Sequence, residues 1–339
     1  MTLNISHCPG TLAAGYHTYS QTALRRVFDN KKVNHLLNFS NDDKARAEMV
    51  GNMAKISISG VQEKLTAVIR DGQIALAPEG TQGRYIIKPI PDYKRIRYRH
   101  FMPANEHLTM QIARQVYRIH TAENAMIFFQ DGEPAYITKR FDVEANGSKI
   151  AQENFASLLG RSAKINGDNF KYGGDYLDIK QLFTTYVAAW KVEISKFFKL
   201  VLFNYIFANG DAHLINFSLQ QTPNGDYILS PAYDLVNSSL HMDDTDFALE
   251  GGLFPAEYKS TLYKEKGHPC QEDFRTFGEL LEVPERQISH IIHEFLAKPS
   301  LVYTLIDHSF LDERMKRMYK RSYEERMERF KRVADRVHY

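Results

Sequence analysis

The sequence predicts an α+β protein of two lobes, a small mixed lobe followed by a larger and mainly helical lobe. Short strand-like runs separated by glycine-containing turns fill residues 64–141, whereas long segments with helical periodicity dominate beyond residue 150. The chain of 339 residues is also longer than one ordinary domain and has a length typical of two.

The first elements are expected to be a helix, a hairpin and a short strand. The polar, asparagine-rich start of the chain contains one helical run, for which we predict a helix around Gln21 to Leu37. Two strand-like runs, 65–69 and 73–76, flank Asp71-Gly72, and glycine at this position is typical of a hairpin turn. A further strand is predicted over Tyr85–Lys88.

A helix and two more strands are expected to complete the small lobe. Asn105 is a favourable N-cap, and Leu108 and Val116 belong to an apolar face with helical spacing, so we predict a helix that starts at Asn105. Strands are predicted over residues 125–129 and 135–141. A polar, turn-rich stretch then marks a lobe boundary.

Two long helices are predicted in the second lobe, at 177–190 and 193–208. The second is apolar nearly all round, which indicates a central buried helix. A strand-turn-strand unit interrupts the helical pattern, with strands near 217–219 and 227–229 around Asn224-Gly225.

The composition excludes several classes of protein. The 43 Lys and Arg residues nearly cancel the 41 Asp and Glu residues, so net charge gives no reason to expect nucleic-acid or membrane binding. Cys8 and Cys270 are too few for a disulfide framework or a zinc site, and no histidine pair has the HxH or HExxH spacing. Without a signal-like start or an apolar run long enough to span a bilayer, a cytoplasmic protein is expected.

Polar residues gather where the buried helix ends. Asn209-Gly210 is a turn dipeptide, and Asp211, His213 and Asn216 follow it in a loop before a strand. Asp234 comes at the end of the returning strand. Because an antiparallel hairpin brings its two ends together, Asn216 and Asp234 should be neighbours.

This pattern suits phosphoryl transfer. One carboxylate orients or deprotonates the attacking hydroxyl, while a second carboxylate and an amide oxygen hold Mg²⁺ against the phosphates. Asp211 and Asn216 have the spacing of a protein-kinase catalytic loop, and Asp234 follows where a metal-binding aspartate would stand. Taken singly each residue is as well explained by a turn or a cap, but the ordered set favours catalysis.

Lys88 supplies a candidate cation in the small lobe. A lysine at a strand end can pair with the α- and β-phosphates of ATP as a point charge, although a lone strand lysine is more often solvated. Glu106, in the first turn of the following predicted helix, could pair with Lys88 or simply complement the helix dipole.

The motifs together resemble the HipA family of kinases from bacterial toxin–antitoxin systems. They follow the family order along the chain: Ser57–Lys64 (the ATP loop), Tyr85–Lys88 (the phosphate lysine), Asn105-Glu106 (a helix start), Thr138–Asp142 (the hinge), Gln152-Glu153, Asn209–Ser218 (the catalytic loop) and Ala232–Leu235 (the metal motif). Residues 236–339 match only as a generic helical lobe.

The resemblance implies a two-lobed, protein-kinase-like fold with ATP and Mg²⁺ as cofactors. Residues 1–50 would pack on an N-lobe of residues 51–141, and residues 142–339 would form the C-lobe. Asp211 would be the catalytic base, and Asn216 and Asp234 the metal ligands. ATP would be bound by Ser59, Gly60, Val61, Gln62, Glu63, Lys64, Lys88, Lys139, Arg140, Phe141, His213, Asn216 and Asp234.

Ser57 and Ser59 are expected to be autophosphorylated. In the family this modification is thought to eject the nucleotide loop, and a dianionic group there would indeed repel the ATP phosphates. Either hydroxyl could instead merely cap the backbone. Only 56 residues precede Ser57, which favours the short HipT-like branch, in which a separate small HipS-like protein supplies the missing N-terminal piece.

The family also implies partners. Its members phosphorylate aminoacyl-tRNA synthetases and are held by a HipB-like helix-turn-helix antitoxin, so contact with DNA would be indirect and no membrane would be involved. Two other functions stay open on the sequence alone. The chain could be a small-molecule phosphotransferase with the same catalytic arrangement of Asp, Asn and Asp, or a catalytically inactive kinase fold that serves as a binding module. A C-terminal run, Asp312 to Val337, is read as an amphipathic helix or as a basic contact face.

Overall fold

The computed structural model describes residues 5–41, 64–78 and 80–332. The chain forms two compact units, and each is assembled from separate stretches of sequence. Unit 1 is built from residues 1–112, 121–149 and 302–317, and unit 2 from residues 113–120, 150–301 and 318–339.

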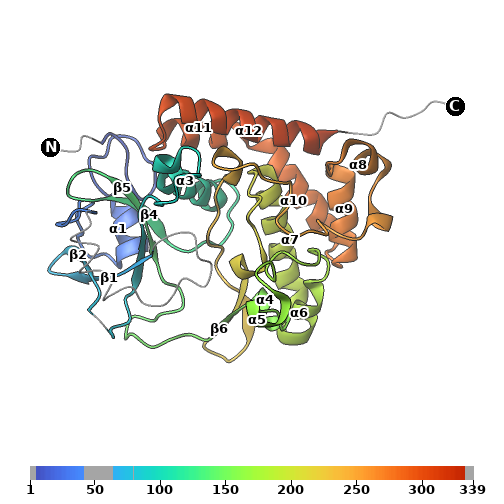
Figure 1. Ribbon diagram of the computed structural model, residues 1–339, viewed down its shortest axis with the longest axis horizontal. Helices are drawn as coiled ribbons and strands as arrows, with labels where there is room; N and C mark the ends of the chain where they lie inside the picture. Colours follow the sequence, from blue (N-terminus) through green and yellow to red (C-terminus); the bar gives the residue numbers. More distant parts are fainter. Residues whose placement is uncertain (1–4, 42–63, 79, 333–339) are drawn as a thin grey trace. The chain divides into compact units, whose positions relative to one another are not determined.

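Unit 1 contains a five-stranded antiparallel sheet with strand order β2-β1-β3-β5-β4 (Figure 1). The strands are β1 (Leu65–Arg70), β2 (Gln73–Leu76), β3 (Tyr85–Lys88), β4 (Asn124–Phe128) and β5 (Pro134–Lys139). Asp71 and Gly72 form the β1–β2 turn with positive φ angles of 49° and 73°, so the predicted hairpin is confirmed. The predicted strand over Tyr85–Lys88 is confirmed with the same bounds.

Helix α1 (Gln21–Phe28) packs on this sheet and is shorter than predicted. Ser20 caps its start by accepting a hydrogen bond from the backbone N–H of Ala23. The prediction that the helix reaches Leu37 is wrong, because Asp29 and Asn30 adopt left-handed conformations with φ of 55° and 62°. The chain then runs beside β4, where the backbone N–H of Leu37 bonds to the carbonyl oxygen of Phe128 at 2.8 Å.

Helix α3 (Met102–Gln115) begins earlier than predicted, directly after the 3₁₀ turn η1 (Arg99–Phe101). Asn105 is therefore not an N-cap. It lies inside the helix, fully buried, and its carbonyl oxygen accepts a hydrogen bond from the Thr109 hydroxyl at 2.9 Å. The 3₁₀ turn starts the helix before Asn105 is reached, which the capping preference of asparagine could not indicate.

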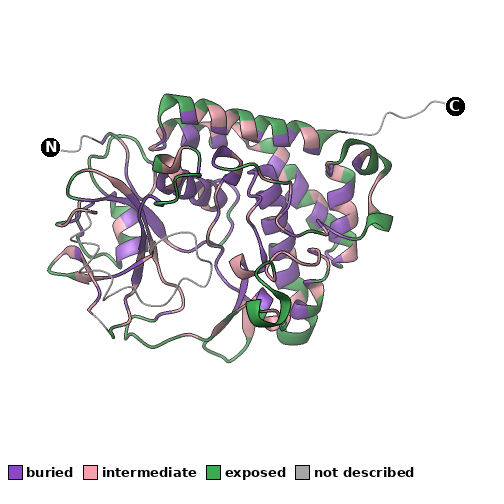
Figure 2. Cartoon of the chain, in the orientation of Figure 1, coloured by how far each residue is buried: buried purple, intermediate pink, exposed green. Residues whose placement is uncertain are grey.

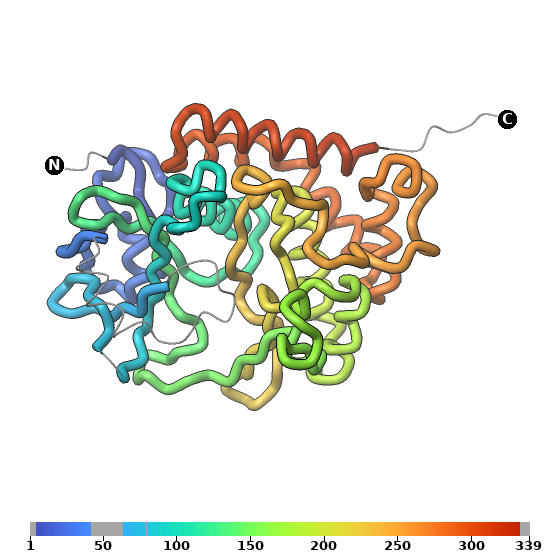
Figure 3. Tube along the Cα trace, viewed as in Figure 1, coloured from blue at the N-terminus to red at the C-terminus, as the bar shows by residue number. Residues whose placement is uncertain are grey.

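Distant parts of the chain meet in unit 1. The rings of His7 and His308 lie 4.6 Å apart, and His308 Nδ1 is 3.1 Å from the carbonyl oxygen of Leu12. In Figure 3 the blue N-terminal part of the tube lies beside the left end of the red segment.

Unit 2 is mainly helical and contains a small antiparallel sheet of order β6-β7-β8. The bounds of its elements are β6 (Gln152–Asn154), α4 (Phe155–Leu158), α5 (Ala163–Asn166), α6 (Lys180–Tyr186), α7 (Trp190–Ile206), η2 (Leu214–Asn216), β7 (Ser218–Gln221), β8 (Tyr227–Leu229), η3 (Ser238–Leu240), η4 (Ala256–Tyr258), α8 (Thr261–Lys266), α9 (Gln271–Leu280) and α10 (Glu285–Ala297). Helices α11 (Pro299–His308) and α12 (Glu313–Lys331) contribute residues to both units.

Helix α7 is the buried core helix that the sequence predicts, and Figure 2 shows it buried along most of its length. The helix predicted over 177–190 is wrong in extent, because α6 ends at Tyr186 and Val187 is extended and buried. Thr184, Thr185 and Val187 are β-branched, and such residues favour extended backbone. The predicted strand-turn-strand unit is confirmed as β7 and β8.

The C-terminal run forms α12, whose buried face includes Tyr319, Tyr323 and Phe330. Its remainder, beyond residue 332, lies outside the described part of the chain. Of the helices within the described ranges, none combines the length and apolar character needed to cross a bilayer.

Candidate active site

The loop that follows α7 is held in one conformation by side chains on both sides of it. Ala208 has a positive φ of 50°, and the buried Asn209 donates a hydrogen bond from Nδ2 to Asn204 Oδ1 at 3.0 Å. The backbone N–H of Gly210 donates to Ser238 Oγ at 2.8 Å, and that hydroxyl donates to the carbonyl oxygen of Ala208. The turn predicted at Asn209-Gly210 is thus anchored at its tip.

Asp211 and Asn216 are brought together by a compact turn. The backbone N–H groups of His213 and Asn216 bond to the carbonyl oxygens of Asp211 and His213, at 2.8 and 2.9 Å. Asn216 Nδ2 donates to the Asp211 carbonyl oxygen at 2.8 Å. The five-residue spacing seen in the sequence therefore closes into a unit in which both residues touch.

The β7–β8 hairpin returns the chain toward this turn. The hydroxyl of Tyr233 donates to the carbonyl oxygen of Ile215 at 2.8 Å and lies 2.6 Å from Ser218 Oγ. Asp234 follows directly in a left-handed conformation with φ of 54°. Its charge raises the pKa of Asp211, so the two carboxylates lie within electrostatic reach of each other.

Asp211 is half-buried, and its environment raises its pKa to about 6. Loss of hydration is the largest cause, and the negative charges of Asp244 and Asp234 add to it. The positive charge of Lys171 and a hydrogen bond from the Tyr172 hydroxyl act in the opposite direction. With 43% of its side chain exposed, Asp211 is accessible to a reactant.

A glycine-rich segment, residues 167–177, holds the 208–217 loop from its other side, and sequence reasoning missed it. Lys171 accepts a backbone hydrogen bond from Leu214 at 3.1 Å, and the buried Tyr176 donates its hydroxyl to the carbonyl oxygen of Ala212 at 2.7 Å. Tyr172 Oη lies 3.4 Å from Asp211 Oδ1. The segment has no helical or strand periodicity, and its only sequence signal is Lys-Tyr before Gly-Gly.

Lys171 also reaches the loop with its side chain. Its Nζ lies 3.0 Å from His213 Nε2, which in turn is 3.7 Å from Asp211 Oδ1. The His213 side chain is buried.

An open pocket of about 890 Å³ has Asp211 in its wall. Other parts of the wall come from the 242–252 stretch, which includes Asp244 and Asp246, and from α12. Gly210 faces this stretch so closely that a Cβ atom there would lie 2.7 Å from Asp244 Cβ.

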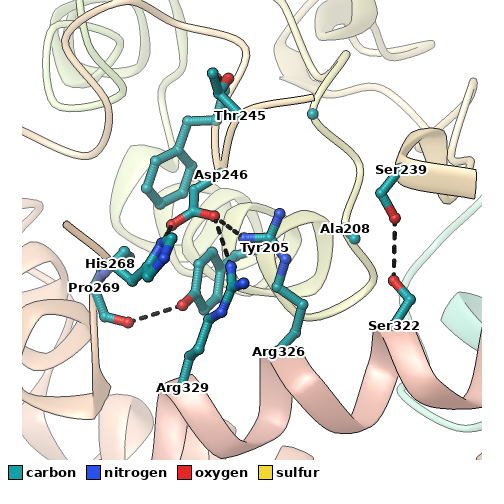
Figure 4. Close-up of polar contacts among 12 residues, drawn as sticks. Tyr205, Ala208, Ser239, Thr245, Asp246, His268, Pro269, Ser322, Arg326 and Arg329 are labelled. Atoms are coloured by element: carbon teal, nitrogen blue, oxygen red, sulfur yellow. Dashed lines mark hydrogen bonds and ion pairs between the residues drawn. The ribbon is translucent and has the colours of Figure 1, made fainter. Parts of the chain in front are cut away.

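Asp246 fixes that stretch to α12 through a cluster of charges, shown in Figure 4. Its carboxylate accepts hydrogen bonds from Arg326, from Arg329 at 3.4 Å and from His268 Nδ1 at 2.7 Å. The Arg326 guanidinium also lies over the ring of Tyr205, 5.2 Å from its centroid. The pocket wall is therefore held by an ion-pair network rather than by a loop alone.

In unit 1, Lys88 and Glu106 form a buried ion pair, with Lys88 Nζ 2.7 Å from Glu106 Oε1. This confirms the pairing that the sequence suggested. Lys139 pairs with Asp29 at 2.5 Å and Arg140 with Asp142, so the charged side chains of the predicted hinge are engaged within unit 1.

The predicted site residues thus fall into three groups. Asp211, His213, Asn216 and Asp234 lie together in unit 2, whereas Lys64, Lys88, Lys139, Arg140 and Phe141 lie in unit 1. Ser57, Ser59, Gly60, Val61, Gln62 and Glu63 lie outside the described residues.

The donor set suits Mg²⁺ bound together with phosphates. Among residues 5–41, 64–78 and 80–332, no three His, Cys, Asp or Glu side chains are grouped so that they alone could hold a metal. Mg²⁺ is commonly held by one or two carboxylates together with substrate phosphates. Because the Asn216 amide nitrogen is bonded to Asp211, its oxygen is the atom left for a cation, and Asp234 supplies a carboxylate nearby.

Comparisons with known proteins show the family of the chain. The profile of the HipA-like C-terminal domain family matches residues 56–300. A Haemophilus influenzae protein named "Putative kinase" is 28% identical over 312 residues, which is 87% of each chain. A Sinorhizobium fredii protein named "Putative kinase Y4dM" is 29% identical over 224 residues, which cover 61% of this chain and 51% of that protein.

A solved structure confirms the fold class. A chain of the Shewanella oneidensis MR-1 toxin–antitoxin complex of HipA, HipB and operator DNA matches with a TM-score of 0.62 at 21% identity. The match covers 81% of this chain and 65% of that chain. The predicted α+β fold, with an N-terminal antiparallel sheet and a helical C-terminal part, is that of HipA.

Proposed function

Because the chain belongs to the HipA-like C-terminal domain family, we propose that it is an ATP-dependent serine/threonine protein kinase. The observation that carries the proposal is the hydrogen bond from Asn216 to the backbone of Asp211, whose carboxylate is influenced by the charge of Asp234 and lines an open pocket. The kinase names of the matched relatives support the same reaction class and the use of ATP.

Asp211 is the proposed base. The acceptor hydroxyl oxygen forms a bond to the γ-phosphorus, the bond from that phosphorus to the bridging oxygen breaks, and ADP leaves. The hydroxyl proton passes to the Asp211 carboxylate, whose pKa of about 6 leaves it mostly ionised at neutral pH but basic enough to accept a proton.

Asn216 and Asp234 are the proposed ligands of Mg²⁺, which when bound neutralises charge on the phosphates. Lys88 is the proposed partner of the α- and β-phosphates. Its support is the buried Lys88–Glu106 ion pair, because protein kinases require a strand lysine paired with a helix glutamate in this role.

The finer parts of the proposal concern regulation and partners. We infer autophosphorylation at Ser57 or Ser59, membership of the HipT-like branch, and a synthetase-like protein substrate. A HipB-like antitoxin and a small HipS-like protein are the proposed partners, and the support for the former is the Shewanella chain, solved with HipB and operator DNA.

The test is incorporation of labelled phosphate from ATP. The wild type should label itself, and Asp211→Asn and Asp234→Asn should each abolish the label while the protein still melts cooperatively. Asp226→Asn, at the exposed turn of the β7–β8 hairpin, is the matched control and should leave labelling unchanged.

Two outcomes would contradict the proposal. Phosphate that still appears in both aspartate variants would refute the assigned base and metal ligand. Label that enters an added aminoglycoside rather than protein would instead support a small-molecule phosphotransferase. If the wild type labels itself, the loss of label in Ser57→Ala or in Ser59→Ala will identify the modified serine.

A further inference from the structure

The proposed catalytic loop carries no positive charge of its own. Residues 208–217 read Ala-Asn-Gly-Asp-Ala-His-Leu-Ile-Asn-Phe and contain neither lysine nor arginine. During phosphoryl transfer, negative charge is spread over the three oxygens of the moving group, and catalysis depends on cations placed against them. A cation from another part of the chain should therefore lie beside Asp211.

Lys171 occupies that place. Its carbonyl oxygen accepts the backbone N–H of Leu214 at 3.1 Å, which pins the residue alongside the loop. Its Nζ lies 3.0 Å from His213 Nε2, and the latter atom is 3.7 Å from Asp211 Oδ1. The ammonium also lies over the ring of Tyr172, 4.9 Å from the centroid.

The Lys171 ammonium has more N–H donors than its hydrogen bond to His213 uses. A lysine side chain has three N–H donors and no acceptor, so Lys171 donates to His213 Nε2, which must be the unprotonated nitrogen. Within the described part of the chain this is its one hydrogen bond, and the side chain is only half-buried. Two N–H groups therefore remain available for an anionic ligand.

Two of the cations that line the pocket are bound to a carboxylate of the protein. Arg326 and Arg329 both donate hydrogen bonds to Asp246. Lys171 is also the cation whose charge lowers the pKa of Asp211, which shows that the two are electrostatically coupled. Among the main influences on the pKa of Asp211, Lys171 is the one lysine or arginine.

We propose that Lys171 is a catalytic residue that donates hydrogen bonds to the phosphoryl group during its transfer, with His213 holding the ammonium in place. The inference rests on the proposed kinase function and adds to it the cation that the catalytic loop lacks. Lys171 keeps its protons throughout. The bonds that form and break are those between phosphorus and the two oxygens, and the acceptor proton goes to Asp211.

Three variants separate charge from packing. Lys171→Met removes the charge and the hydrogen bond to His213, whereas Lys171→Gln can keep that hydrogen bond but not the charge. Lys171→Arg keeps the charge. Lys164→Met, on the exposed helix α5 a few residues earlier, is the matched control for loss of one lysine from this region.

Steady-state labelling gives the first readout. Removal of one preorganised donor to a charged transition state typically lowers kcat about 100- to 1000-fold, and we expect this for Lys171→Met and Lys171→Gln with little change in the KM for ATP. Lys171→Arg should recover roughly tenfold or more of the loss, and Lys164→Met should behave as the wild type.

Calorimetry measures a binding affinity that would not change if Lys171 had only a structural role. ADP with Mg²⁺ should bind to the wild type and to Lys171→Gln equally. Addition of aluminium fluoride, which mimics the transferring phosphoryl group, should tighten binding to the wild type but much less to Lys171→Gln.

Each alternative result has a definite meaning. A kcat within about threefold of the wild type in Lys171→Gln would show that Lys171 only positions His213, and would overturn the proposal while leaving the kinase function intact. A loss confined to the KM for ATP would also overturn it. A wild type that transfers no phosphate would refute the proposed function itself, and this inference with it.

Discussion

Replacing Asp246 by alanine should destabilise the protein and slow phosphate transfer together. Its carboxylate joins α12 to the wall of the pocket through Arg326, Arg329 and His268 (Figure 4). Asp244, two residues earlier, packs directly against Gly210 in the proposed catalytic loop. Release of Asp246 therefore frees the stretch on which the loop rests.

The size of the effect follows from how deeply each charge is buried. The side chains of Asp246 and Arg326 are 12% and 8% exposed, whereas that of Arg329 is 28% exposed. Removing one partner of a buried ion pair costs about 3–5 kcal/mol, because the other charge stays buried without compensation. Asp246→Ala leaves the buried Arg326 guanidinium without its carboxylate, whereas the more exposed Arg329 can turn to solvent.

Arg326→Ala should cost less. Asp246 still accepts hydrogen bonds from Arg329 and His268, so the loss is that of one charged hydrogen bond, about 1.5–3 kcal/mol. In the double variant both buried charges are gone, and its destabilisation should be clearly smaller than the sum of the two single effects.

Thermal melting and labelling provide the assay. With about 2–4 °C of Tm per kcal/mol, Asp246→Ala should melt roughly 6–20 °C below the wild type. Arg321→Ala, on the same helix but with a side chain 81% exposed, should leave the Tm unchanged. Strictly additive single variants, or an Asp246→Ala protein that melts like the Arg321→Ala control, would refute the reasoning.

Three further predictions address the proposed site residues of unit 2, around Asp211, and of unit 1, around Lys88. Since burial raises the pKa of Asp211 to about 6, its basic form is lost as the pH falls through that value, so the labelling rate should decline on the acid side. A rate that stays flat to about pH 5 would contradict a basic role. Gly210→Ala puts a Cβ 2.7 Å from Asp244 Cβ, so it should cost about 1–3 kcal/mol and lower activity, as a thermal melt and labelling will show. Lys88→Met should weaken ATP binding in calorimetry, and it should also destabilise the protein because the buried Glu106 carboxylate loses its lysine. Adding Glu106→Gln removes that charge, so it should restore stability but not ATP binding.

Local signals explain which parts of the fold could be predicted. The strands β1, β2 and β3 follow from β-branched runs and from Asp71-Gly72, whose turn depends only on its own residues. The return of the chain after β8, which brings Tyr233 to the backbone of Ile215, could be predicted from the hairpin because antiparallel pairing brings the two ends of a hairpin together.

The errors arise where tertiary contacts override local preference. Asp29 ends α1 in a left-handed conformation, after which Leu37 bonds to the backbone of Phe128 beside the sheet. Asn105 is a good cap by type but lies buried within α3. In both places the chain follows contacts with distant residues, which a window of neighbouring residues does not contain.

The glycine-rich segment 167–177 shows the same limit at the site. Gly251, which packs against this segment, and Gly173, which lies within it, provide a final test. Gly251 donates its backbone N–H to the carbonyl oxygen of Gly174 at 2.9 Å, and a Cβ on Gly251 would lie 2.9 Å from that same oxygen. Gly251→Ala must therefore push backbone away from backbone. At Gly173 a Cβ would meet only the end of the Arg161 side chain, at 3.0 Å, which can move.

The two substitutions are chemically identical but should differ in effect. We expect Gly251→Ala to cost about 1–3 kcal/mol by overpacking. It should also slow labelling by up to about 100-fold, because a shift of the segment moves Lys171 and Tyr172 relative to Asp211. Gly173→Ala should stay near the wild type in both measurements. If both variants label at the wild-type rate, the segment does not position the proposed catalytic loop, and the hydrogen bonds from Leu214 and Tyr176 are structural only.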